Sequence, residues 1–259
     1  MTIRLAALCL AAFFALTWLP LGQQAFMEQH WMKIGAFVAP ILMFMAVKHR
    51  DPTRATPLAD ISLMASVFAA AYLLHQVEEH WVDLLGRPYP LYDLLNSLIA
   101  GAVGEDKYGV MTPSALFYVN AGTVWTIAFV AILVSPRHVF PAIAMAGLMF
   151  VNGVAHAVVA AAQFSYNPGL ATSIVLFVPL SVLFFRSLLQ TGTATLQMIL
   201  AAIFYGVFGH IYLFAGLFAA NIYGLIPPAV YYVGLILFGL VPLALFRPYA
   251  AGVNQSGVA

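Results

Sequence analysis

The sequence predicts an all-α fold, a polytopic transmembrane helix bundle, on three observations. Hydrophobic residues make up 63% of the 259 residues and charged residues only 7%, whereas soluble domains carry about 25% charged residues. The apolar runs extend over roughly 20 residues, which is the length that a helix needs to cross a bilayer. They also lack the alternation of apolar and polar residues that a membrane β-strand shows.

Eight apolar runs are candidate membrane spans. They cover residues 3–21, 33–47, 61–81, 113–135, 139–163, 170–189, 195–221 and 226–246. The second run is short, so we expect it to extend back through His30 and Trp31 or to tilt, and seven spans are the alternative. No small-residue cleavage pattern follows the first run, which favours a retained helix over a signal peptide.

The positions of Lys and Arg predict the orientation of the chain. With both termini in the cytoplasm, seven basic residues lie inside and three outside, which agrees with the positive-inside rule. The seven are Arg4, Lys48, Arg50, Arg54, Arg137, Arg186 and Arg247, and the three are Lys33, Arg87 and Lys107. We therefore expect a multi-pass protein of the cell membrane, with residues 1–249 as one transmembrane domain and residues 250–259 as a flexible tail.

Charge and cysteine content restrict the partners. The net charge of +1 gives no reason to expect a nucleic acid. The apolar runs make the lipid bilayer the expected partner. The chain has one cysteine, Cys9, which excludes an internal disulfide framework and a cysteine metal cluster. Composition leaves the oligomeric state open.

Ionisable residues gather near the end of the third run, at a depth where charge is costly. The segment His-Gln-Val-Glu-Glu-His begins at His75, and each charged side chain in a bilayer centre costs roughly 2.5–3.5 kcal/mol on insertion scales. On a helix His75, Glu78 and Glu79 share one face. Gln76 and His80 point elsewhere, and we expect His80 at the membrane interface. This segment is therefore the candidate functional site.

Polar residues of two other runs reach the same depth as His75. At a rise of about 1.5 Å per residue, His75 lies about 21 Å from the cytoplasmic end of its run. Asn152 and His156 lie about 20 and 26 Å up the fifth run, and His210 about 22 Å up the seventh. Hydrogen bonds between helices are the alternative role for these residues. Their common depth instead favours one shared site.

Two features come from the predicted outer side. Tyr118 and Asn120 enter the same layer within one or two turns of the start of the fourth run. The loop over residues 87–112 is longer than a connector needs, which indicates a lid or interfacial helix over the site, with a disordered loop as the alternative.

The two adjacent acids predict a metal site. Neighbouring carboxylates in a low-dielectric region need a proton, a cationic partner or a metal ion, and imidazole with carboxylate suits zinc or non-haem iron. We expect His75, Glu79 and His156 to bind a divalent metal, with His210 as a fourth ligand on the strength of depth alone. Glu78 would then be a general base or a partner that orients a ligand.

Three motifs carry a family resemblance. They are His-Gln-Val-Glu-Glu at 75–79, Asn-Gly-Val-Ala-His at 152–156 and Tyr-Asn-Pro-Gly at 166–169. At these motifs the chain resembles the HXXEE-motif family of uncharacterised bacterial integral membrane proteins. The resemblance implies a polytopic protein of the bacterial inner membrane that is suspected of being an enzyme, and it implies no substrate. The third motif has the composition of a tight turn, so we interpret it as a chain reversal, with Tyr166 pointing into the site as the alternative.

Two classes of function fit these residues. The first is a membrane-embedded metal-dependent enzyme, a hydrolase or in a variant an iron oxygenase, that acts on a lipid-like or apolar substrate near the outer leaflet. Glu78 or Glu79 would activate water there, and Asn152 or Tyr118 would polarise the substrate. The second is a proton- or cation-coupled transporter that uses the same cluster as a relay. The sequence shows no internal repeat, and its polar groups gather on one side, which favours the enzyme.

Overall fold

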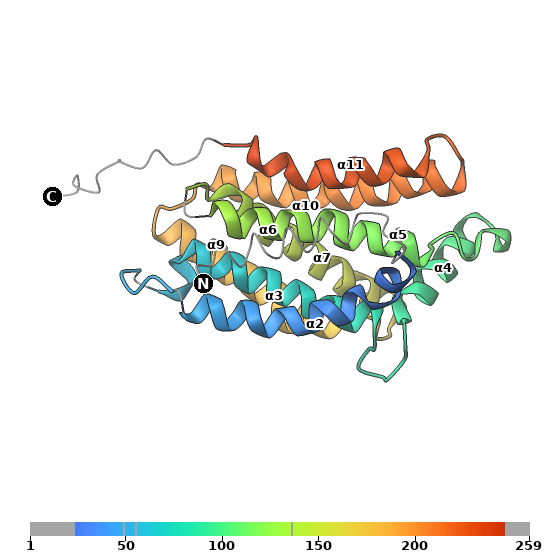
Figure 1. Ribbon diagram of the computed structural model, residues 1–259, viewed down its shortest axis with the longest axis horizontal. Coiled ribbons are helices and arrows are strands. Elements are labelled where there is room, and N and C mark those ends of the chain that lie inside the picture. The colour runs from blue at the N-terminus through green and yellow to red at the C-terminus, as the bar shows by residue number, and fades with distance from the viewer. Residues whose placement is uncertain (1–23, 49, 55, 136, 247–259) are drawn as a thin grey trace.

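The computed structural model describes residues 24–48, 50–54, 56–135 and 137–246, and these form a bundle of long helices along one common axis with α4 at one end (Figure 1). The α-helices are α2 (Gln24–Lys48), α3 (Ile61–His80), α4 (Pro90–Val103), α5 (Pro113–Phe117), α6 (Trp125–Val134), α7 (Phe140–Gln163), α8 (Leu170–Thr172), α9 (Val178–Gln190), α10 (Leu196–Leu217) and α11 (Pro228–Leu240). Short π-helical turns cover Tyr118–Val124, Ser173–Phe177 and Phe218–Ile222, and 3-10 turns cover Pro57–Ala59, Glu105–Lys107 and Val241–Leu243. The described residues form no sheet, so the all-α prediction is confirmed for them.

Six helical segments of the described chain are long and apolar enough to cross a membrane. They are Ala25–Lys48, Ile61–His80, Pro113–Val134, Phe140–Gln163, Leu170–Gln190 and Leu196–Ile222, and Pro228–Leu243 is a shorter apolar helix. α2 begins at Gln24, which confirms the expected extension through His30 and Trp31. The predicted run 3–21 and the tail 250–259 lie outside the described residues. The total of eight spans and the cytoplasmic placement of the termini therefore stay predictions.

Side-chain oxygens cap three of these helices where they begin. Asp60 accepts a hydrogen bond from the Leu63 backbone N–H at the start of α3, and Thr112 accepts one from Ala115 at the start of α5. Thr195 does the same for α10. Such caps satisfy backbone donors that a helix leaves unpaired at its first turn.

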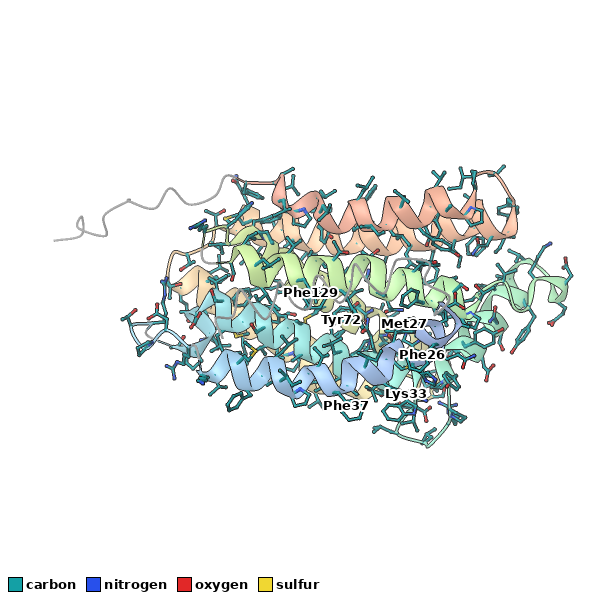
Figure 2. The ribbon with its side chains drawn as sticks, viewed as in Figure 1. Phe26, Met27, Lys33, Phe37, Tyr72 and Phe129 are labelled. Atoms are coloured by element: carbon teal, nitrogen blue, oxygen red, sulfur yellow. The ribbon has the colours of Figure 1, made fainter. Side chains whose placement is uncertain are left out.

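Apolar side chains cover both the inside and the outside of the bundle. Phe37 on α2 points away from the bundle and is 72% exposed, whereas Tyr72 on α3 is only 4% exposed (Figure 2). A bilayer explains this pattern, because hydrocarbon accepts an outward phenyl ring that water would not favour. α7 lies at the centre and contacts α3, α6, α9 and α10. It therefore carries its polar residues into the middle of the protein.

The α7–α10 contact depends on two glycines that let the backbones approach. A Cβ atom at Gly147 would collide with the backbone carbonyl of Ala202, and one at Gly206 would lie 2.7 Å from the carbonyl oxygen of Gly147. Small residues of this kind permit close packing between membrane helices. The contact sets the distance between α7 and α10, and therefore the width of the cavity that both helices line.

Part of the loop over residues 87–112 is helical and forms α4. The return segment, residues 104–112, folds back onto that helix. The side chain of Asn96 is fully buried. Its Oδ1 accepts hydrogen bonds from the backbone N–H groups of Gly109 at 3.0 Å and Met111 at 2.9 Å, and its Nδ2 donates to the Met111 carbonyl at 3.1 Å. The helix interpretation is confirmed, and the disordered alternative is wrong because one buried amide satisfies the backbone of the return segment.

We expect Gly147→Ala to lower the free energy of unfolding by about 1–3 kcal/mol, because the new methyl group meets a backbone atom that cannot move alone. The measurement is the melting temperature of the purified protein in detergent. Gly101→Ala on α4 is the control, since a Cβ there meets nothing within 4 Å. Equal melting temperatures for the two variants would contradict the close α7–α10 contact.

Candidate metal centre

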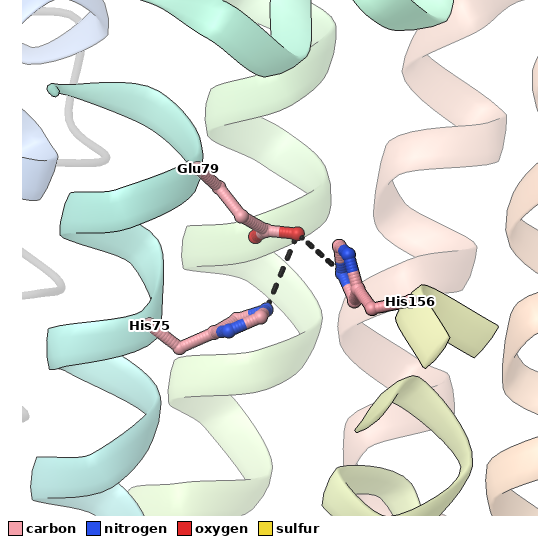
Figure 3. Close-up of side chains that lie close together, drawn as sticks. All are labelled: His75, Glu79 and His156. Carbon is pink, nitrogen blue, oxygen red and sulfur yellow. Dashed lines mark ion pairs between the residues drawn. The ribbon is translucent and has the colours of Figure 1, made fainter. Parts of the chain in front are cut away.

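Three predicted ligands from two helices meet in one buried group. His75 and Glu79 lie one turn apart in the last part of α3, and His156 comes from α7 (Figure 3). Glu79 Oε1 lies 3.2 Å from His75 Nε2 and 3.0 Å from His156 Nε2. One ligand atom from each residue lies within 4.8 Å of the other two. The predicted meeting of His75 and Glu79 with His156 is confirmed.

The proton on His156 is assigned by its neighbour. Asn167 Nδ2 donates to the backbone carbonyl of His156 at 2.9 Å, and a carbonyl can only accept. The Asn167 amide is therefore oriented with Oδ1 toward His156 Nδ1, at 2.7 Å. Nδ1 must carry the proton in that contact. In the neutral ring Nε2 then presents a lone pair to Glu79.

A second chain of hydrogen bonds assigns the proton on His75. The Thr172 hydroxyl donates to Glu78 Oε2 at 2.6 Å and contacts His75 Nδ1 at 2.7 Å. A hydroxyl has one proton to give. Since that proton goes to the carboxylate, His75 Nδ1 must be the donor to Thr172, and the neutral ring again presents its Nε2 lone pair to Glu79.

The three groups leave a place for a cation. Two imidazole lone pairs and a carboxylate oxygen converge, and electron-rich atoms at such distances repel one another unless a positive charge lies between them. His75 Nε2 is buried and makes no hydrogen bond to the described residues. The Nδ1 atoms of both rings donate to outer partners, Thr172 and Asn167. Metal-binding histidines likewise donate their second ring N–H to a carboxylate, a backbone carbonyl or a water molecule. His75, Glu79 and His156 could therefore hold a metal ion.

Glu78 has a different set of partners from Glu79. Its Oε1 accepts hydrogen bonds from the Tyr166 hydroxyl at 2.7 Å and from the Ala171 backbone at 3.0 Å. Its Oε2 accepts from the Thr172 backbone at 2.8 Å as well as from the hydroxyl. These donors satisfy the carboxylate at the first turn of α8, where backbone N–H groups favour negative charge. The donors around Glu78 are not shared with Glu79, so the two adjacent acids lie in different surroundings.

The Tyr-x-Pro-Gly motif does more than reverse the chain, and the alternative that Tyr166 points into the site is the one observed. Tyr166 donates to Glu78, and Asn167 accepts from His156. Burial, with the hydrogen bond to the Glu78 carboxylate, raises the pKa of Tyr166, so its hydroxyl stays a donor. Gly169 adopts φ +89°, and a Cβ there would lie 2.7 Å from carbon atoms of both His75 and His156. The motif forms the wall of the site.

His80 is buried next to Glu79, whereas we expected it to lie apart from the cluster. It is 3% exposed, and its Nε2 lies 3.4 Å from Glu79 Oε2. Asn120 Nδ2 also contacts His80 Nε2, at 3.1 Å. Asn120 Oδ1 accepts from Gln76, whose own oxygen accepts from the donor-only indole of Trp125. This polar network connects α3 to the fourth predicted span and supports the far side of Glu79.

The other predicted site residues occupy three different places. Asn152 donates to the Tyr72 hydroxyl at 3.3 Å, and His210 Nδ1 contacts the Gly206 carbonyl at 2.8 Å. The three-residue group does not include either of them. Tyr118 stacks on Tyr232, with ring centroids 4.6 Å apart. Of the two polar residues at the start of the fourth span, the one that joins the polar network is Asn120.

A cavity of about 370 Å³ reaches the centre from the side of α4. α4, the Tyr118–Val124 turn, α7 and α10 supply most of its walls, which are mainly apolar, with leucine the most frequent residue. Glu79 and His156 stand in the wall, as do Asn152 and His210. The volume falls in the range of small-molecule sites, about 300–1,000 Å³. An apolar space that ends on the polar centre fits an amphiphile.

The fold and site define a class: a multi-pass helical membrane protein with a buried His/Glu cluster that could bind a metal ion. Residues 66–184 match the family model HXXEE, described as a protein of unknown function with HXXEE motif. This match covers a little under half of the chain, and it confirms the resemblance seen in the three motifs. No curated protein and no solved structure gives a significant match.

We expect Gly169→Ala to destabilise the protein more than a positive φ alone explains, because its Cβ would press on both imidazole rings. Gly192→Ala is the matched control: Gly192 has φ +64°, and a Cβ there meets nothing within 4 Å. A left-handed alanine costs about 1–2 kcal/mol, and the clash adds to this at Gly169. Melting temperatures of the two variants measure the difference, and equal values would contradict the packing of Gly169 on the site.

Proposed function

We propose that this protein is a membrane-embedded metal-dependent enzyme of the hydrolytic class, and that it acts on an amphiphile drawn from the bilayer. The observation that carries the proposal is the convergence of two imidazole Nε2 atoms on one carboxylate oxygen. Both imidazoles use their Nδ1 protons in hydrogen bonds to Thr172 and Asn167, which leaves the Nε2 lone pairs free. Such a donor set has no purpose in helix packing, for which a single hydrogen bond between helices is enough. It matches the needs of a divalent cation.

The ligand types restrict the metal. Two histidines and one glutamate occur in zinc hydrolases, and two histidines with a carboxylate also bind non-haem iron. In both cases three protein ligands leave a position open for water or substrate. A metal bound here would supply Lewis acidity and would lower the pKa of bound water toward 7. We favour zinc, and the metal analysis below distinguishes it from iron.

The protein residues divide the remaining work. Thr172 with Glu78, and Asn167, hold the two imidazoles in the tautomers that leave Nε2 free. Of the two adjacent acids, Glu79 lines the cavity and Glu78 does not, so we assign the role of activating water to Glu79. Glu78 acts through Thr172 as a positioning residue.

The cavity supports substrate entry from the membrane. Its walls are apolar along α4 and α10, and Leu98 of α4 is 44% exposed while it lines the cavity. An apolar chain can thus lie along α4 with its polar end at His156. With the N-terminus in the cytoplasm, as the basic residues predict, this end of the bundle faces the outer leaflet.

The test of the metal site is the metal content of the purified protein by mass spectrometry. We expect about one zinc per chain in the wild type and a large loss in His156→Ala and Glu79→Ala, since each removes one of three ligands. His210→Ala is the control and should keep its metal, because His210 lies outside the group. A wild type without stoichiometric metal, or full retention in both ligand variants, would end the proposal.

The positioning role of Thr172 gives a separate prediction. Thr172→Val keeps the shape of the side chain but removes the hydroxyl that links His75 to Glu78. Loss of an outer partner of this kind costs about 10- to 100-fold in metal affinity. Competition with a metal chelator measures the affinity, and Thr191→Val, directly after the end of α9, is the control. An unchanged affinity would show that Thr172 does not orient His75.

A proton- or cation-coupled transporter is the competing function, and it predicts a different measurement. In liposomes under a pH gradient, a relay through the acids would give a proton flux that Glu78→Gln abolishes. We expect the wild type and Glu78→Gln to show the same background leak. A flux that depends on Glu78 would favour the transporter.

A further inference from the structure

The cavity contains polar groups that the metal centre does not use. Asn152 on α7 and His210 on α10 both stand in its wall. They lie about one turn beyond Gly147 and Gly206, where the two helices touch. The close backbone contact therefore brings these two side chains to the same end of the cavity, beside His156.

His210 offers an acceptor to the cavity. Its Nδ1 lies 2.8 Å from the backbone carbonyl of Gly206, which can only accept, so Nδ1 carries the proton of the neutral ring. Its Nε2 is then a lone-pair acceptor, and no hydrogen bond to Nε2 is found among the described residues.

Asn152 offers an amide that is largely unused. One proton of Nδ2 goes to the Tyr72 hydroxyl at 3.3 Å, and Oδ1 is buried without a partner in the described chain. The amide thus keeps a second proton and an acceptor. A group that both donates and accepts would match this pair of side chains: it gives a proton to His210 and receives one from Asn152.

The rest of the cavity accepts hydrocarbon. Leu91, Leu95 and Leu98 of α4 line it, as do Leu213 and Phe214 of α10. A carboxylate head would only accept hydrogen bonds, so it would leave His210 unsatisfied and would add negative charge beside Glu79. A hydroxyl head avoids both costs.

We propose that the cavity binds a long-chain lipid with a hydroxyl head group, which donates to His210 Nε2 and is received by Asn152, with its hydrocarbon chain between α4 and α10. This inference deepens the proposed function and rests on it for any chemistry at the centre. The binding itself requires only the cavity. A free long-chain alcohol and the hydroxyl of a larger lipid share this chemistry.

The test compares three probes on the wild type in phosphatidylcholine nanodiscs: dodecan-1-ol, its methyl ether and dodecanoate. The methyl ether keeps the chain and the oxygen but lacks the donor proton. Saturable binding is measured with labelled dodecan-1-ol above its partition into empty nanodiscs, and the other two compete. We expect the alcohol to compete about tenfold or more better than the ether, the cost of one buried acceptor left unpaired, with dodecanoate weaker again.

Three variants relate the preference to the cavity. His210→Phe keeps an aromatic ring but removes the acceptor, so it should weaken alcohol binding about tenfold and abolish the preference over the ether. Leu213→Trp fills the cavity and should block all three probes. Phe208→Leu is the control, since Phe208 is 59% exposed and does not line the cavity, and it should bind as the wild type does.

Two outcomes would overturn the inference: no saturable binding above empty nanodiscs, or equal competition by alcohol and ether in the wild type. Neither needs a variant to fold. Metal content is measured on the same samples, which separates the two proposals. Metal without alcohol binding would leave the proposed function standing and remove this inference. Alcohol binding in a protein without metal would do the reverse.

Discussion

The meeting of Glu79 Oε1 with two imidazole Nε2 atoms is the interaction on which the rest of the site depends. A carboxylate buried at membrane depth is costly unless it is compensated. Here both imidazoles are oriented so that the Nε2 lone pair of each neutral ring points at the carboxylate. A cation between the two Nε2 atoms and Glu79 Oε1 would satisfy all three groups. Asn167 and Thr172 maintain that arrangement at the outer ring nitrogens. The surrounding helices supply the low-dielectric, rigid frame that gives these hydrogen bonds their strength.

The segment between α7 and α9 determines whether this arrangement can form. In a few residues it supplies the amide for His156, the hydroxyl for His75 and the backbone donors for Glu78. Gly169 has no side chain, and only glycine fits between the two rings at that φ. One short connection thus orients two ligands and stabilises the second acid. The Asn120 network on the opposite side of Glu79 completes the enclosure, so the carboxylate has defined neighbours on both oxygens.

Depth along the helix predicted the three ligands correctly, whereas the sequence did not predict which face each helix turns toward the site. His75, Glu79 and His156 lie together because a constant rise per residue places them in one layer. The same reasoning included His210, which lies in the layer but bonds to its own helix at Gly206. It placed Tyr118 and Asn120 in the same layer, and of the two we expected Tyr118 to act on the substrate. These residues are two apart, on nearly opposite faces of the helix, and only packing against α3 decides which face turns inward.

The sequence by itself determined that this is a helical membrane protein and that its polar residues concentrate at one end, because composition and periodicity follow directly from bilayer physics. It also identified the motif pairs 75–79 and 152–156. The tertiary structure alone decided that the two acids have different partners, that His80 is buried, and that the motif at 166–169 closes the site. Those outcomes depend on which side chains of distant segments come within hydrogen-bonding distance. Helix rotation and loop path set these distances, and neither produces a periodic pattern in the amino-acid sequence.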